Sequence, residues 1–356
     1  MNLRVTIVLV AVAIVVGAVA YINPFKDIPE FEEDSPWFFQ LAEEDIETIE
    51  VVFQGDSVKF VKVDVKRYLW EFEEPAGIPP NRDRWGGITL LLSGPRTRRD
   101  LTPQKQIIED PAEYGLDNPS TIVTVGLTQD RNIEFRLGDT TTDGLHHYGQ
   151  ISGFPQLFII ADSWGDVIAR LVTEPPIPRW YEERDPESIV EVNLTLGDTR
   201  EKDTPILRFK FEKEKDDRNE GWFVEDSRRG EDEEPLAVDA EFWAGIVPLL
   251  GRPSGISVEQ HSVDDQDYTP WGIIDDSPAV ELRFFGVSDR GSEFTDGITF
   301  KIGSKTPDEQ SYFAHQITDN VINPVLLIDA DWVETLLDLF DDVPYADSES
   351  AAAQGN

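Results

Sequence analysis

Four histidines are the side chains best suited to metal binding or general acid–base chemistry, because the chain has no cysteine. The lack of cysteine excludes disulfides, thiolate ligands and cysteine nucleophiles. His146 and His147 are adjacent in a stretch that alternates like a strand, so they should point to opposite faces and could share one ion only at a bulge. Spacing places no third ligand beside them. We therefore expect no metal site and interpret this pair as surface or half-buried residues; the other histidines are His261 and His315.

Carboxylates are too abundant to mark a catalytic pair, since the chain has 70 acidic residues. The segment "EKDDRNEG" (214–221) is typical of a hairpin turn and fails the pattern of a calcium-binding loop. The segment "HSVDDQDYTP" (261–270) is interpreted as an acidic loop, with weak cation binding as the alternative.

Glycines do not form a phosphate-binding motif, and neither a G-x-S-x-G elbow nor a dinucleotide-binding fingerprint occurs. Gly138 and Gly303 each follow a strand-like run, as "LGD" and "IGS", and we expect them to be turn glycines with a permissive φ. With no catalytic or cofactor-binding residue to name, we expect a protein that is not an enzyme and uses no cofactor.

The same order of landmarks occurs twice along the chain, which indicates an internal duplication. The segment "EYGLDNPSTIVTV" (113–125) is matched by "TPWGIIDDSPAVELRF" (269–284), and eight of the nine tryptophans pair between the copies. The ninth, Trp271, aligns with Tyr114. Each copy mixes alternating, strand-like runs with two helical stretches. We therefore predict an α+β fold: two tandem domains of mostly antiparallel sheet with two helices each.

Helix starts and one helix break can also be predicted. Asp83 is a candidate N-cap for the first helical stretch, and Asp162 or Ser163 for the second. In the second copy, Pro248 should shorten or kink the corresponding helix.

The aromatic-Gly-aliphatic segments that begin the matched landmarks are predicted to be structural corners. The aromatic and aliphatic side chains should enter the core, the glycine should turn the chain, and the proline should start the next strand where no ladder donor is needed. The corner residues are Tyr114, Gly115, Pro119, Trp271, Gly272 and Pro278.

The organisation expected from these patterns has six parts. They are an anchor (1–22), an acidic stalk (23–45), the first repeat (46–172), a proline-rich linker (173–188), the second repeat (189–342) and a disordered tail (343–356). The linker prolines should restrict the angle between the repeats.

The N-terminal segment "VTIVLVAVAIVVGAVAYI" (5–22) has no charge and is long enough to cross a bilayer core as a helix. Arg4 precedes it and an acidic flank follows, so the positive-inside rule places the body on the extracytoplasmic side. A signal peptide cleaved after Ala20 is the alternative, and it exports the body too. The formal net charge of −39 argues against nucleic acid or an anionic membrane surface as partner.

The order of these landmarks resembles the bacterial domain-of-unknown-function family 4340. The resemblance rests on "YGLDNP", "FRLGDTTTDG" and "HHYGQISG" and covers residues 46–172, and more weakly the second copy, where "WGIIDDSP" departs from the pattern. It implies one N-terminal membrane helix, repeated extracytoplasmic domains and association with ABC-type transport machinery of the gliding-motility class. It implies no activity and no catalytic residues.

The expected function is therefore that of a membrane-anchored accessory or scaffold protein with membrane-protein partners such as an ABC-type permease. A binding module for glycan or another envelope ligand is the second possibility, and a hydrolase with a site between the repeats is the third. Trp37, Phe38 and Phe39 beside the stalk are candidates for partner contact, with packing on the first repeat or placement at the membrane interface as alternatives.

Overall fold

The computed structural model describes nine stretches of the chain: residues 38–64, 69–94, 99–100, 108–213, 220–230, 233–263, 266–288, 290–317 and 324–346. The predicted anchor, Trp37 and most of the expected stalk lie outside these residues. Among the residues that are described, no helix combines the length and apolar character required to cross a bilayer.

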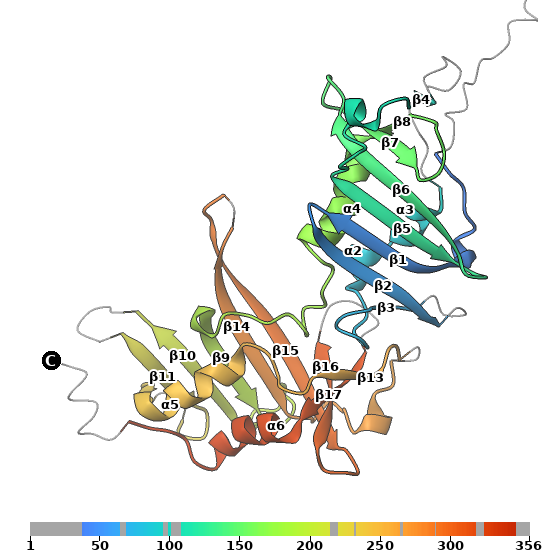
Figure 1. Ribbon diagram of the computed structural model, residues 1–356. Coiled ribbons are helices and arrows are strands. Elements are labelled where there is room, and N and C mark those ends of the chain that lie inside the picture. Colours follow the sequence, from blue (N-terminus) through green and yellow to red (C-terminus); the bar gives the residue numbers. More distant parts are fainter. Residues whose placement is uncertain are drawn as a thin grey trace, which may run out of the picture.

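Alternating apolar residues build two large antiparallel sheets, one from each half of the chain (Figure 1). The first sheet has the order β3-β2-β1-β5-β6-β7-β8-β4. Its strands are β1 (Ile46–Phe53), β2 (Asp56–Asp64), β3 (Leu69–Phe72), β4 (Arg99–Asp100), β5 (Thr121–Leu127), β6 (Arg131–Thr140), β7 (His146–Ile151) and β8 (Phe158–Ala161).

The second sheet has the order β12-β11-β10-β9-β14-β15-β16-β17-β13. Its strands are β9 (Ile189–Thr195), β10 (Ile206–Glu212), β11 (Gly221–Asp226), β12 (Leu236–Ala237), β13 (Ser257–Gln260), β14 (Ala279–Val287), β15 (Glu293–Lys305), β16 (Ser311–Ile317) and β17 (Val325–Asp329). If β12 is set aside, the two sheets have the same strand order. The repeat found in the sequence therefore has a counterpart in the topology.

The helices are short. In the first repeat they are α2 (Arg82–Trp85), α3 (Ile88–Ser93) and α4 (Asp162–Thr173), and in the second they are α5 (Ala240–Ile246) and α6 (Ala330–Leu337). The first helical stretch is split into α2 and α3 because Gly87 adopts a left-handed φ of 85°. As Pro248 predicts, α5 ends at Ile246 and the chain continues as the 3-10 helix η5 (Val247–Leu250).

Two predicted N-caps were wrong. The cap of α2 is Asn81, whose side chain accepts hydrogen bonds from the backbone N–H groups of Asp83 and Arg84. Helix α4 starts at Asp162, and Ala161 occupies the cap position without a side-chain bond. Asp162 is not free to cap, because its carboxylate lies 2.8 Å from the ring of His147.

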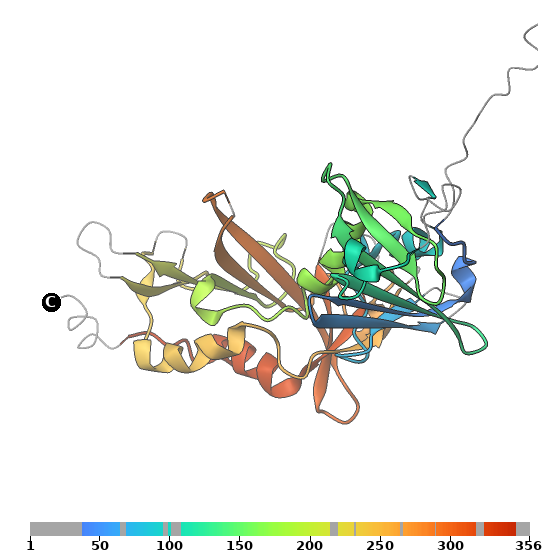
Figure 2. The same cartoon turned by 45° about the horizontal axis from the view of Figure 1, so that its top comes forward.

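Each sheet buries one face under its helices and leaves the other half-buried and polar. Strand β5 illustrates this, since Thr121, Val123, Val125 and Leu127 are buried and the residues between them are not. Both views place α5 and α6 along one face of the second sheet (Figures 1 and 2). The opposite face has cross-strand ion pairs such as that of Arg208 and Glu225, at 3.0 Å.

The core of each repeat contains a cluster of aromatic side chains, and the two clusters correspond. In the first repeat, the ring of Trp85 lies 4.4 Å from that of Phe60 and 5.6 Å from that of Trp70. In the second, Trp243 lies 4.4 Å from Phe209 and 5.2 Å from Trp222. The predicted pairing of Trp70 with Trp222 and of Trp85 with Trp243 is thus also a correspondence in space.

The last helix of each repeat, α4 or α6, also makes a corresponding hydrogen bond. The indole N–H of Trp164 donates to the carbonyl of Leu91 at 3.4 Å, and that of Trp332 donates to the carbonyl of Leu249 at 2.7 Å. In each repeat this bond joins the closing helix to the helical segment that follows the third strand.

The repeats differ most at one hairpin. Strand β5 pairs with β1 as far as Leu127, and a three-residue turn (128–130) leads into β6. In the second repeat, Phe284 is the last residue of β14 paired with β9, and β14 and β15 continue as a two-stranded arm. The eleven residues 285–295 stand where the first repeat has three, which is a difference of eight (11 − 3). Figure 1 shows this arm extending from the sheet.

Candidate functional site

The adjacent histidines of β7 do not form a common site. The Nδ1 atom of His146 lies 3.5 Å from a carboxylate oxygen of Asp143, and the Nε2 atom of His147 lies 2.8 Å from Asp162. The two side chains use separate carboxylates, as expected from the alternation of strand side chains. Within the described ranges, no group of three or more histidines and carboxylates is arranged to hold a metal ion.

The remaining histidines have structural surroundings. The ring of His315 on β16 stacks on that of Tyr268, with centroids 4.5 Å apart. Burial, and secondarily the positive charge of Lys301, lowers the pKa of His315 to about 4. The ring is therefore neutral near pH 7. In the acidic loop of the second repeat, Asp267 accepts hydrogen bonds from the N–H and hydroxyl of Thr269, which lower its pKa.

The two corners have the same backbone geometry. A 3-10 turn ends at Tyr114 and another at Trp271, and each is followed by a left-handed glycine: Gly115 at φ 66° and Gly272 at φ 69°. The next residues, Leu116 and Ile273, are buried. The aliphatic side chain thus enters the core as predicted, whereas both aromatic side chains are only half-buried.

The prolines of the two corners differ slightly in position. Pro278 immediately precedes β14, and its carbonyl accepts a hydrogen bond from Ile302 at 2.8 Å. Pro119 stands two residues before β5, which begins at Thr121. Both prolines precede their strands, where the missing N–H removes no bond between strands.

The interpretation of Gly138 and Gly303 as turn glycines was wrong, because both lie inside strands, β6 and β15, and neither has a positive φ. Their function is close packing against the corner. A Cβ atom on Gly138 would lie 2.1 Å from the carbonyl oxygen of Tyr114, and one on Gly303 would lie 2.4 Å from that of Trp271. Sequence pattern locates a glycine at the end of an apolar run, but only the packing reveals the backbone that approaches it.

Phe38 and Phe39 are buried, with 2% and 7% of their surface exposed. Phe38 contacts Phe135 and Phe158 at ring distances of 5.7 and 5.0 Å. These two side chains are therefore not presented to a partner, and packing on the first repeat is the alternative that their burial supports. The expected stalk also ends earlier than predicted, since Leu41 donates its N–H to the carbonyl of Ser93.

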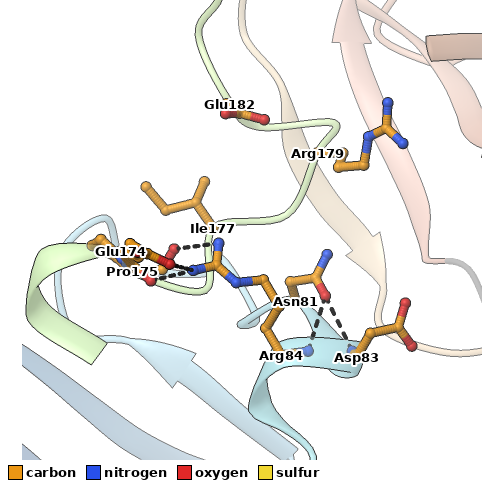
Figure 3. A pocket seen from close by; sticks show the side chains of 8 residues that line it. All are labelled: Asn81, Asp83, Arg84, Glu174, Pro175, Ile177, Arg179 and Glu182. Carbon is orange, nitrogen blue, oxygen red and sulfur yellow. Dashed lines mark hydrogen bonds and ion pairs between the residues drawn. The ribbon is translucent and has the colours of Figure 1, made fainter. Parts of the chain in front are cut away.

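A cavity of about 470 Å³ lies where the first repeat meets the linker (Figure 3). It is lined by Asn81, Asp83, Arg84, Glu174, Pro175, Ile177, Arg179 and Glu182. Figure 3 shows the guanidinium of Arg84 directed at the linker backbone. It donates to the carbonyls of Glu174 and Pro175, the latter at 3.1 Å.

The second repeat holds the other end of the linker. Arg179 donates to Asp296 and, at 2.9 Å, to the carbonyl of Gly297, at the base of the arm. Arg252 donates to the carbonyl of Tyr181 at 3.2 Å and lies over its ring. The arginines around the cavity are thus engaged with protein groups, and the arrangement connects the repeats rather than directing side chains at a reacting atom.

A contact between His261 and Glu71 joins the repeats directly. The Nε2 atom of His261, which follows β13, lies 2.9 Å from the carboxylate of Glu71 on β3. The His261 side chain is 25% exposed and that of Glu71 is 15% exposed. This contact adds a second connection at a distance in sequence from the linker.

The linker of the first repeat corresponds to the C-terminal segment of the second. The N-cap residue Asn81 donates its backbone N–H to the carbonyl of Pro176 at 2.6 Å, and the N-cap residue Asp239 donates to that of Pro344 at 2.9 Å. Residues 343–346 are therefore part of the second repeat, not of a disordered tail as predicted. Tyr345 forms a bridge with Val238 and donates its hydroxyl to Asp226 at 2.9 Å.

Two exposed apolar surfaces were missed by sequence reasoning. One is the arm, where Val287 and Phe294 are 58% and 50% exposed. The other is the outer side of α5 and η5, with Phe242 and Leu249 at 47% and 40%. The scarcity of charge in "AEFWAGIVPLLG" (240–251), within an otherwise charge-rich chain, is the signal that could have located the second.

Comparison with known proteins assigns neither a family nor a function to this chain. No family model matches this chain, and no solved structure matches it.

Proposed function

We propose that this chain is a non-catalytic, membrane-anchored extracytoplasmic protein that acts as an accessory or scaffold in a membrane assembly of the ABC-type transporter class. The observation that carries the proposal is the linker, which is hydrogen-bonded to both repeats. Arg84 holds its start, and Arg252 holds the carbonyl of Tyr181. A scaffold needs its binding surfaces at a fixed spacing, and a linker fastened at both ends provides that.

The surfaces available to partners also support this proposal. Exposed apolar side chains on the arm and on α5 lie in the second repeat. Contiguous exposed apolar surfaces are typical of protein interaction sites. The N-terminal apolar segment supports attachment to a membrane, and the resemblance of residues 46–172 to the family named above supports a place beside a transporter.

The proposal is tested by photo-crosslinking in the membranes of the native host. A benzophenone amino acid replaces Leu90 in the first repeat or Phe294 on the arm, both of which are exposed. We expect the crosslinked neighbour to be an integral membrane subunit, identified by mass spectrometry. Recovery of soluble envelope proteins alone, at both positions, would argue against a scaffold of a membrane complex.

Location and anchoring are tested separately. Since the chain has no cysteine, one cysteine introduced at Asn132 can be labelled with a membrane-impermeant maleimide in intact cells. We expect labelling without lysis and a mature N-terminus upstream of residue 5. A mature protein that begins at Tyr21 would instead indicate a cleaved signal peptide, and labelling only after lysis would contradict the extracytoplasmic location.

A further inference from the structure

The outer side of α5 and η5 is an exposed helical surface with little charge. Trp243, Ile246 and Leu250 point into the core, whereas the residues between them, apart from the half-buried Val247, are exposed. Both views show α5 on the outside of the second sheet (Figures 1 and 2). The exposed residues form what we call the α5 surface: Phe242, Ala244, Gly245, Pro248 and Leu249.

The corresponding surface of the first repeat already has an occupant. The capping residues Asn81 and Asp239 correspond, so Arg84 stands at the position of Phe242. Arg84 donates to the linker, which leads to the next repeat. The second repeat thus has an exposed phenylalanine where the first has an arginine bonded to the linker, while its own following segment meets the start of α5 only through Asp239 and Pro344 among the printed backbone bonds.

Acidic residues border the α5 surface. Glu241 is exposed on the helix itself. Asp341 and Asp342 are exposed on the segment that reaches Asp239 through Pro344. The nearby arginines are already paired: Arg228 with Asp226 at 2.8 Å, and Arg229 with Glu233 at 2.5 Å.

We propose that the α5 surface binds a partner helix that has one apolar face flanked by lysine and arginine. An apolar helix face is a common binding partner for an apolar groove or surface. Basic flanking residues complement the acidic border and the net charge of −39, whereas a second copy of this chain would bring like charge to the contact. This inference rests on the proposed scaffold function and specifies the chemistry of its partner.

The test uses the full chain in zwitterionic nanodiscs, with empty nanodiscs as the blank. The probe is a fluorescent 18-residue helix with leucine on one face and lysine on both flanks. A second probe has the same lysines, with serine and glutamine in place of leucine. Fluorescence anisotropy gives the dissociation constant of each.

We expect the amphipathic probe to bind wild type at least about tenfold more tightly than the polar one. The double variant Phe242→Ser, Leu249→Ser should weaken its binding by about tenfold or more. The matched control Leu90→Ser, at an exposed leucine of the first repeat, should change it less than about twofold. Because both probes have the same charge, this comparison separates specific docking from general attraction to an acidic protein.

Two results would overturn the proposal: the double variant could bind the amphipathic probe like wild type, or the polar probe could bind as well as the amphipathic one. If the double variant binds the probe like wild type but loses affinity for zwitterionic vesicles, the occupant is a lipid surface. Crosslinks from Leu90 and Phe294 to a membrane subunit would stand in each case, so failure here is distinguishable from failure of the scaffold function.

Discussion

Arg84 of α2 donates a hydrogen bond to the carbonyl of Pro175 in the linker at 3.1 Å. The bond connects a helix of the first repeat to the segment that leads into the second. Replacement by alanine should therefore loosen the connection between the repeats.

We expect Arg84→Ala to broaden the distribution of distances between the repeats. The lack of cysteine allows spin labels at two introduced cysteines, Asn132→Cys and Lys210→Cys, and pulsed electron paramagnetic resonance measures the distances. Broadening should be partial, because the contact between His261 and Glu71 remains. Glu71→Gln in the same chain should increase it.

The control for this measurement is Arg82→Ala, on the same short helix and also exposed. It should leave the distance distribution unchanged. A distribution as narrow in Arg84→Ala, Glu71→Gln as in wild type would mean that these contacts do not fix the repeats.

The close approach of each corner to a strand glycine predicts a steric cost. Gly138→Ala and Gly303→Ala place a Cβ atom within 2.4 Å of a carbonyl oxygen. Each should lower the free energy of unfolding by about 1–3 kcal/mol or more, as overpacked cores do. Urea denaturation followed by tryptophan fluorescence measures this.

Gly221→Ala is the matched control, since a Cβ atom there has no heavy atom within 4 Å. It should leave stability unchanged or raise it slightly, because alanine restricts the unfolded chain. Equal losses at all three glycines would contradict the role of the corners.

The buried carboxylate of Asp226 predicts acid sensitivity of the second repeat. Its pKa is lowered first by the side chain of Arg228, and Tyr345 also donates to it. A depressed pKa gives stability that is complete above the unfolded value of about 4 and is lost as pH falls through the folded value. Asp226→Asn should cost about 1–3 kcal/mol at pH 7.

The free energy of unfolding, measured from pH 7 to pH 2, tests whether the contribution of Asp226 to stability falls as the pH falls. The difference between wild type and Asp226→Asn should shrink as the pH falls below about 4, because the unfolded chain then binds a proton that folded Asp226, with its lowered pKa, does not. Glu225, which is exposed and pairs with Arg208, offers a control. Glu225→Gln should lower the free energy of unfolding by at most about 1 kcal/mol. A difference that is constant over the whole range would rule out an ionic contribution from Asp226.

His315 is expected to make stability depend on pH as well, but in a higher pH range than Asp226. Burial lowers its pKa to about 4, so between pH 4 and about 6.5 the unfolded chain binds a proton that the folded chain does not. Stability should therefore fall as pH falls through this window, by about 1–3 kcal/mol. His315→Gln should reduce that loss. A His315 ring signal that titrates near pH 6.5 in nuclear magnetic resonance spectra would contradict this prediction.

The main structural features that sequence could predict are those encoded by local periodicity. Alternation identified the strands, and the order of landmarks identified the repeat. The left-handed glycines after Tyr114 and Trp271 were also predictable, because a turn there requires a residue tolerant of positive φ. Their match at φ 66° and 69° follows from local sequence in both copies.

Only the tertiary structure determined which surfaces are covered. Phe38 is buried because Phe135 and Phe158, about 100 residues away in sequence, close over it, and no local pattern reports such a contact. For the same reason Gly138 proved to be a packing position, and Phe242 proved to be exposed although it occurs in an apolar run. Sequence by itself determined the elements and their repetition, since these depend on neighbouring residues. Packing between distant segments decided the close contacts, the hydrogen bonds of the linker and which apolar side chains of α5 remain exposed.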